Sequence, residues 1–79
     1  MATMEEIETM VALQLGRRRV DAGDRIIADL GAESVDVVNI IANVEDRYDI
    51  AIEEGELPRI ETVGDLYECV RQKLARGSR

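Results

Sequence analysis

The sequence predicts an all-α fold, a small four-helix bundle made of three main helices and one short irregular helix, with a long loop after the first. The chain has 79 residues, which suffices for one modest core and so for a single domain spanning residues 1–79. Its composition is 46% hydrophobic but only 3% aromatic, so the core must be aliphatic. Apolar residues also recur at helical spacing in three segments. An aliphatic core of this size is typical of packed helices.

The first helix is predicted over about residues 3 to 16. Thr3 and Glu6 have the spacing of a capping box, in which each side chain accepts a backbone N–H of the helix start. Gly16 can adopt the left-handed conformation that ends many helices. Three arginines at 17–19 follow at once, and their charge complements the negative end of the helix dipole.

Residues 17–33 are predicted to form the long loop, because they lack sustained helical spacing. Its apolar residues, which we expect to attach it to the core, are Ile26, Ile27 and Leu30. A calcium loop beginning at Asp21 is excluded, because Gly23 and Arg25 occupy positions that would need oxygen ligands. Loops of this length in small domains are often functional.

The second helix is predicted from Ser34 to about Tyr48. Apolar residues cover more than half of its circumference, which indicates a mostly buried central helix. Its β-branched residues would also suit a strand over 35–44, but the length and the narrow polar strip favour a helix. That strip consists of Asp36, Asn39, Asn43, Asp46 and Arg47.

The rest of the chain is predicted to hold one irregular turn and a last helix. Pro58 disfavours helical backbone at Leu57, so any helix there is short. The last helix begins at Thr62, which can cap it together with Asp65. We expect residues 77–79 to be disordered.

Charge and composition exclude several function classes. The formal net charge is −7, which makes nucleic acid and anionic membranes poor partners and favours a basic protein partner. The chain has no histidine, so we expect no catalytic residues and no metal site. No uncharged stretch approaches the ~20 residues of a membrane span. With its single cysteine, the chain is expected to be a cytoplasmic monomer that is not inserted in a membrane.

Ser34 stands where the long loop meets the second helix, and two interpretations are open. A serine at that place is most often an N-cap. Alternatively, its hydroxyl is a point of attachment, where a phosphodiester would meet free backbone N–H groups and the positive end of the helix dipole. Because the chain has no histidine to activate the hydroxyl, a separate enzyme would have to modify it.

Two motifs in register resemble the acyl carrier proteins. Residues 27–36 read I-A-D-L-G-A-E-S-V-D, and the family's usual core is D-L-G-A-D-S-L-D. Residues 60–65 read I-E-T-V-G-D and resemble the family's I-T-T-V-G-D. The resemblance implies that Ser34 receives 4′-phosphopantetheine from coenzyme A through a phosphopantetheinyl transferase that uses magnesium. The arm's thiol then carries acyl groups as thioesters.

The resemblance also implies a docking surface for the transferase and for acyl-transferring, condensing and modifying enzymes. Its residues are Glu33, Val35, Asp36, Asn39, Asn43 and Asp46. Glu33 keeps the charge of the usual Asp with a longer side chain, Val35 is smaller than the usual Leu, and Asn39 replaces a common acidic residue. The strip then carries only Asp36 and Asp46 against Arg47, so its charge is small. Apolar contacts should therefore dominate docking. Fatty acid, polyketide and specialised lipid biosynthesis all remain open as pathways.

By the same resemblance, an acyl chain would fold back between the second helix and the following segments. The expected lining is Ile26, Ile27, Ile40, Val44, Ile52, Leu57, Ile60 and Leu66. Leu57 and Leu66 stand where the family often has smaller side chains. We therefore expect short or compact acyl groups to be sheltered best.

Other interpretations use the same residues differently. A peptidyl or aryl carrier of a nonribosomal peptide pathway would share the attachment serine, and an unmodified acidic adaptor would share only the fold. Cys69 is expected to be a half-buried apolar residue and the acidic run at 53–56 a solvated loop.

Overall fold

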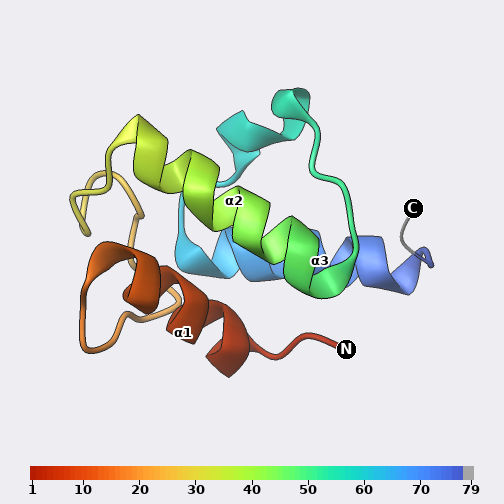
Figure 1. Cartoon of the computed structure of the whole chain (residues 1–79), viewed down its shortest axis with the longest axis horizontal. Helices are drawn as coiled ribbons and strands as arrows, with labels where there is room; N and C mark the ends of the chain where they lie inside the picture. The colour runs from red at the N-terminus through yellow and green to blue at the C-terminus, as the bar shows by residue number, and fades with distance from the viewer. Residues whose placement is uncertain (78–79) are drawn as a thin grey trace.

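The computed structural model describes residues 1–77, and Ser78 and Arg79, part of the predicted disordered tail, lie outside the described residues. The helices, in chain order, are α1 (Met4–Leu15), α2 (Ser34–Tyr48), the 3-10 helix η1 (Glu54–Arg59) and α3 (Val63–Ala75). Figure 1 shows α1, α2 and α3 packed together, with η1 at the periphery away from α1. The predicted all-α class, the helix order and the long loop after the first helix are confirmed.

The ends of α1 and α3 follow the predicted capping. Thr3 Oγ1 accepts the backbone N–H of Glu6 at 3.1 Å, and the Glu6 carboxylate accepts the Thr3 N–H at the same distance. Thr62 Oγ1 likewise accepts the N–H of Asp65 at 3.0 Å. Gly16 ends α1 with φ +67°, in the left-handed region.

The arginines after Gly16 do not lie in the last turn of α1, contrary to the predicted role at the helix end. The helix stops at Leu15, because the left-handed backbone at Gly16 turns the chain away. The Arg17 guanidinium instead donates to the carbonyl of Leu30 at 3.3 Å. Arg17 therefore ties the beginning of the long loop to its end.

The core is aliphatic, as expected, and every helix except η1 contributes to it. The residues that are at most 2% exposed are Ile7, Val11, Ile40, Val44, Ile50, Val63, Leu66 and Val70. No polar or charged residue among residues 1–77 is buried. At about 25 cal/mol per Å² of buried apolar surface, these side chains are the main source of stability.

The long loop is attached to the beginning of α3 by backbone hydrogen bonds. Ile26 N–H donates to the Glu61 carbonyl at 2.9 Å, and Gly64 N–H donates to the Ala22 carbonyl at 2.8 Å. A Cβ at Gly64 would lie 3.1 Å from that carbonyl oxygen, a tight contact, so this close approach favours a glycine. The attachment fixes the loop that leads to Ser34.

Ile27 does not join the core, contrary to prediction. Ile26 is 4% exposed, whereas Ile27 is 60% exposed. Both residues lie in a turn that follows the isolated bridge between Arg25 and Thr62, and in it the Asp29 N–H donates to the Arg25 carbonyl at 2.8 Å, so successive side chains point in different directions. One isoleucine therefore faces the core and the next faces solvent.

Candidate functional site

Ser34 is the first residue of α2, and the predicted N-cap role for it is wrong. Glu33 is the N-cap, with extended backbone angles of φ −93° and ψ 169°. The Glu33 carbonyl accepts the N–H of Val37 at 3.1 Å, and its N–H donates to the Asp36 carboxylate at 3.0 Å. The helical hydrogen bonds thus start one residue earlier than the sequence indicated.

Because Glu33 is the cap, the Ser34 hydroxyl has no capping role. Ser34 is exposed, and its hydroxyl makes no hydrogen bond with any residue in the described range 1–77. The first three N–H groups of α2 have no acceptor within the helix, and they lie at the positive end of its dipole. A phosphodiester on Ser34 Oγ fits this place, since it would accept hydrogen bonds there and gain from the dipole.

Ser34 also borders an apolar groove of about 510 Å³. Its wall on α2 is formed by Val37 and Val38, and its opposite wall by Leu57 and Pro58. The full lining is Ile26, Ile27, Ser34, Val37, Val38, Glu54, Leu57, Pro58, Ile60 and Glu61. A group attached to the hydroxyl could therefore reach apolar surface within the same molecule.

The predicted acyl-pocket residues divide into two sets. Ile26, Ile27, Leu57 and Ile60 line the groove. The other four are packed into the core, and these are Ile40, Val44, Ile52 and Leu66. They are at most 9% exposed, so they form the closed interior beneath the groove and not its accessible lining.

Sequence reasoning missed the α2 side of the groove. Val37 and Val38 lie three and four residues after Ser34, which places all three on one face of the helix. That helical spacing is a signal present in the sequence. The contribution of Pro58 had no such signal, because it depends on where η1 lies relative to α2.

The predicted docking residues lie along α2, but they are not equivalent. Those that are exposed are Glu33, Val35, Asn39, Asn43 and Asp46. Asp36 is half-buried, and its carboxylate accepts the Glu33 N–H that begins the helix. One of its carboxylate oxygens is therefore occupied by the start of the helix. Val35 is 58% exposed, and the neighbouring Val38 is 60% exposed.

A second hollow of about 520 Å³ lies at the other end of the molecule, between the N-terminal residues and α3. Its lining includes Tyr67 and Leu74 but no serine. Size alone therefore does not distinguish the two hollows, whereas the adjacent hydroxyl does.

Comparison with known proteins identifies the family. Residues 5–70 match the family described as a phosphopantetheine attachment site. The chain is 31% identical over 80 residues to the acyl carrier protein of Thermotoga maritima, covering 94% of this chain and 99% of that protein. It is 35% identical over 74 residues to an acyl carrier protein of Streptococcus pyogenes, covering 92% and 97%. The chain belongs to the acyl carrier protein family.

Membership confirms the family predicted from the two motifs. The cofactor of this acyl carrier protein is 4′-phosphopantetheine, and the family works with a transferase and with biosynthetic enzymes. Carrier proteins are not themselves catalytic. Within residues 1–77, no helix is long and apolar enough to cross a membrane, and no cluster of side chains could hold a metal ion.

Proposed function

We propose that Ser34 is the site at which this acyl carrier protein receives its 4′-phosphopantetheine arm. The observation that carries the proposal is the free, exposed hydroxyl in the first turn of α2, beside the apolar groove. The first N–H groups of α2 would hold the phosphodiester, and the bound arm would supply a thiol for thioester formation.

The attachment reaction needs a second protein. The Ser34 oxygen attacks the phosphorus of coenzyme A that bears the pantetheine, and the bond to the other phosphate breaks, releasing adenosine 3′,5′-bisphosphate. The hydroxyl proton passes to a base of the transferase, since the carrier has no histidine to accept it. The carrier contributes the oriented hydroxyl and the docking surface along α2.

After attachment, the carrier holds acyl intermediates as thioesters for fatty-acid, polyketide or specialised-lipid enzymes in the cytoplasm. It performs no chemistry of its own, and the tether raises the local concentration of the intermediate at each enzyme. We place it in acyl transfer and not in peptidyl transfer, because its relatives are named acyl carrier proteins.

We also propose that the groove shelters short or compact acyl groups. Support comes from the closed interior beneath it, because Ile40, Val44 and Leu66 are at most 2% exposed and leave no room for a long chain to enter the core. A longer chain would extend past the groove into solvent. Each methylene that stays sheltered would contribute about 0.8 kcal/mol.

Substitution of the two serines tests the attachment site. Incubation with coenzyme A and a broad-specificity transferase should add one phosphopantetheinyl group to the wild-type chain, as measured by mass spectrometry. Ser34→Ala should gain nothing, and it should lose no more than about 0.5 kcal/mol of stability because the hydroxyl caps nothing. Ser78→Ala, the matched control at the only other serine, should gain the group normally.

Two outcomes would contradict the proposal. A mass gain in Ser34→Ala would show that another residue is modified. No gain in the wild-type chain, with an authentic carrier modified in parallel, would favour an unmodified acidic adaptor.

A further inference from the structure

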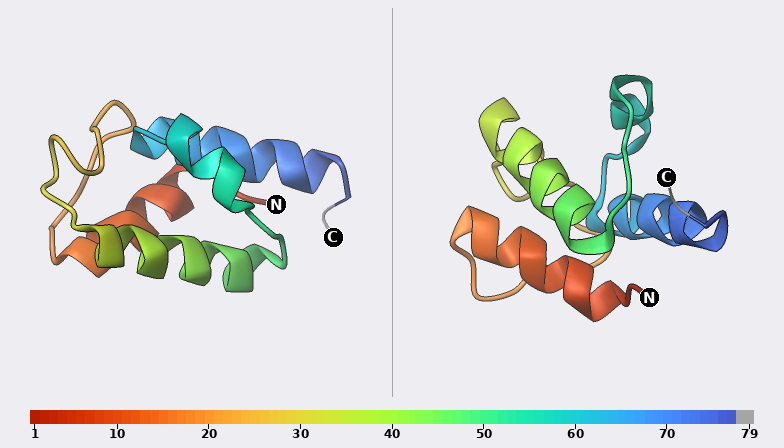
Figure 2. Two further views of the ribbon diagram at one scale, coloured as in Figure 1. Left: turned by 90° about the horizontal axis from the view of Figure 1, so that it is seen from above. Right: turned by 45° about the vertical axis from the view of Figure 1, so that its right-hand side comes forward.

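The wall of the groove formed by η1 is held in place differently from the rest of the molecule. None of the residues of η1 is buried, and its apolar packing comes from Leu57, which lies partly buried against the core. Leu57 and Pro58 form the side of the groove opposite Val37 and Val38. In the right-hand view of Figure 2, η1 stands away from the three α-helices. The width of the groove therefore depends on what fixes η1.

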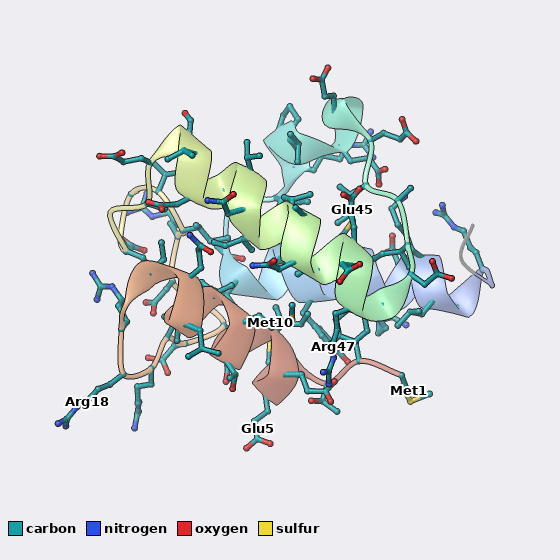
Figure 3. The ribbon with its side chains drawn as sticks, viewed as in Figure 1. Met1, Glu5, Met10, Arg18, Glu45 and Arg47 are labelled. Atoms are coloured by element: carbon teal, nitrogen blue, oxygen red, sulfur yellow. The ribbon has the colours of Figure 1, made fainter. Side chains whose placement is uncertain are left out.

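The two segments that flank η1 are well anchored. Ile52, which precedes it, is 9% exposed, and its N–H donates to the Glu45 carboxylate at 2.7 Å. Figure 3 shows Glu45 pointing from α2 toward the segment that leads to η1. After η1, the Glu61 carbonyl accepts the Ile26 N–H. The short helix therefore connects two segments that are each held by a hydrogen bond to another part of the molecule.

One ion pair holds the middle of η1. Lys73 Nζ on α3 lies 2.8 Å from Glu56 Oε2, and these side chains are 16% and 30% exposed. The other ion pairs within residues 1–77 have side chains between 37% and 58% exposed. The hydrogen bond from Lys73, followed by that from the Glu53 N–H, lowers the pKa of the Glu56 carboxyl. Glu56 is thus paired and partly buried, whereas the acidic run at 53–56 was predicted to be a solvated loop.

We propose that the Lys73–Glu56 ion pair determines how far η1 stands from α2, and thereby the size of the acyl group that the groove shelters. The part of this inference that concerns the acyl group rests on the proposed function, whereas the part that concerns the position of η1 does not. The α2 wall is part of a helix with buried residues on its inner side, so it cannot move freely. Opening the groove for a larger group requires η1 to move, which stretches or breaks the ion pair.

Cys69 provides a native measure of that movement. It lies with Glu56, Arg59 and Ile60 in a hollow of about 180 Å³ between η1 and α3. The thiol is half-buried, and Sγ lies 3.8 Å from Glu56 Oε1. Burial, followed by the charge of Glu56, raises the pKa of the thiol. Displacement of η1 would expose Cys69 and speed its alkylation.

The first experiment compares alkylation of the unmodified protein by iodoacetamide, so that no pantetheine thiol competes. Lys73→Met should react about two to five times faster than wild type, because loss of a partly buried ion pair raises the population with η1 displaced. The electrostatic effect alone has the opposite sign, since the Lys73 ammonium lowers the thiol pKa and its removal would slow the reaction. Acceleration therefore reports movement.

Arg71→Met is the matched control. Arg71 lies on the same helix and pairs with Glu68 at 2.8 Å, but both side chains are exposed and neither belongs to η1. This variant also loses one cation from α3, and its alkylation rate should equal that of wild type. A Lys73→Met rate at or below the wild-type rate would overturn the proposal.

The second experiment measures cargo size. Wild type and Lys73→Met are loaded at Ser34 with amide-linked acyl pantetheine, which has no thiol and does not hydrolyse, in a series of chain lengths. Methyl chemical shifts of Val38 and Leu57 should stop changing at a shorter chain in wild type than in Lys73→Met. Identical series would overturn the proposal even if alkylation differed. Failure of wild type to take any arm would overturn the proposed function, while the alkylation result would still test the position of η1.

Discussion

The contact between α1 and the C-terminal end of α2 is built very differently from the groove beside Ser34. The Glu6 carboxylate joins the two helices, since it accepts the Tyr48 hydroxyl at 3.1 Å and the Arg47 guanidinium at 3.3 Å. It also caps α1 through Thr3. Figure 3 shows Arg47 pointing toward the beginning of α1, while Glu45 points to the other side of α2. The side facing α1 is thus closed by specific polar contacts.

The groove side, in contrast, leaves apolar surface open. Three large hydrophobic side chains near Ser34, those of Ile27, Val35 and Val38, are 58% to 60% exposed. Such exposure adds nothing to folding, but it offers contacts to a tethered group or a docking enzyme. The comparison teaches that this carrier separates the residues that hold the fold from those that present the cargo.

The largest effect expected from this separation is on stability. Leu66 is fully buried, whereas Leu57 is half-buried in the groove wall. Leu66→Ala should lower the free energy of unfolding by about 2 to 5 kcal/mol, because it leaves a cavity in the core. Leu57→Ala should cost about 1 kcal/mol or less, because η1 can settle into the space. Urea denaturation measures both, and equal losses would contradict the separation.

A smaller effect is expected in acid. The hydrogen bond from Thr3 and then that from Tyr48 lower the pKa of Glu6, and the Lys73 contact lowers that of Glu56. A carboxyl whose pKa is lower in the folded protein than its usual value of 4.5 stabilises the fold at pH values above 4.5. This stability disappears as the pH falls through the folded pKa. The free energy of unfolding should therefore be level from neutral pH to about 5 and fall below it.

Loss of the Glu6 carboxyl and loss of the Glu56 carboxyl should change the acid dependence of stability to different extents. Glu6→Gln should flatten the acid limb of stability measured by urea denaturation, because Glu6 joins α1 to α2. Glu56→Gln should change that limb less, because Glu56 holds only the peripheral η1. Glu5→Gln, at an exposed neighbour in the first turn of α1, serves as the control and should leave the limb unchanged. A larger effect at Glu56 than at Glu6 would reverse the comparison.

Most of the fold could be predicted from local patterns. The capping boxes at Thr3 and Thr62 and the apolar spacing along α2 each depend on residues within a few positions of one another. Such short-range signals are complete in the sequence. The same holds for Gly16, where the backbone conformation follows from the residue type.

The site was less predictable, because it depends on contacts between distant segments. Ile26 faces the core and Ile27 faces solvent because the turn that holds them is attached to the Glu61 carbonyl through the Ile26 N–H, and no local pattern indicates that attachment. Lys73 meets Glu56 only because η1 lies beside α3 in the fold. The cap of α2 shifted from Ser34 to Glu33 because Asp36, three residues on, accepts the Glu33 N–H. That last signal is local, but it competes with the stronger general preference for serine as the cap.

The smallest effects are expected in docking, where the comparison predicts that apolar contacts outweigh charge. Val35→Ala should lower the kcat/KM of the transferase about fivefold, because it removes exposed methyl groups that the enzyme would bury. Glu33→Gln and Asp46→Asn should each change it about twofold or less, since exposed charges in water contribute little. Asp36 is left intact, because its carboxylate helps to begin α2.

Leu13→Ala, at an exposed leucine on α1, is the apolar control and should have no effect. If kcat/KM instead fell steeply between low and moderate salt, and the double variant of Glu33 and Asp46 removed that dependence, charge would dominate docking. The exposed valines would then serve the cargo alone.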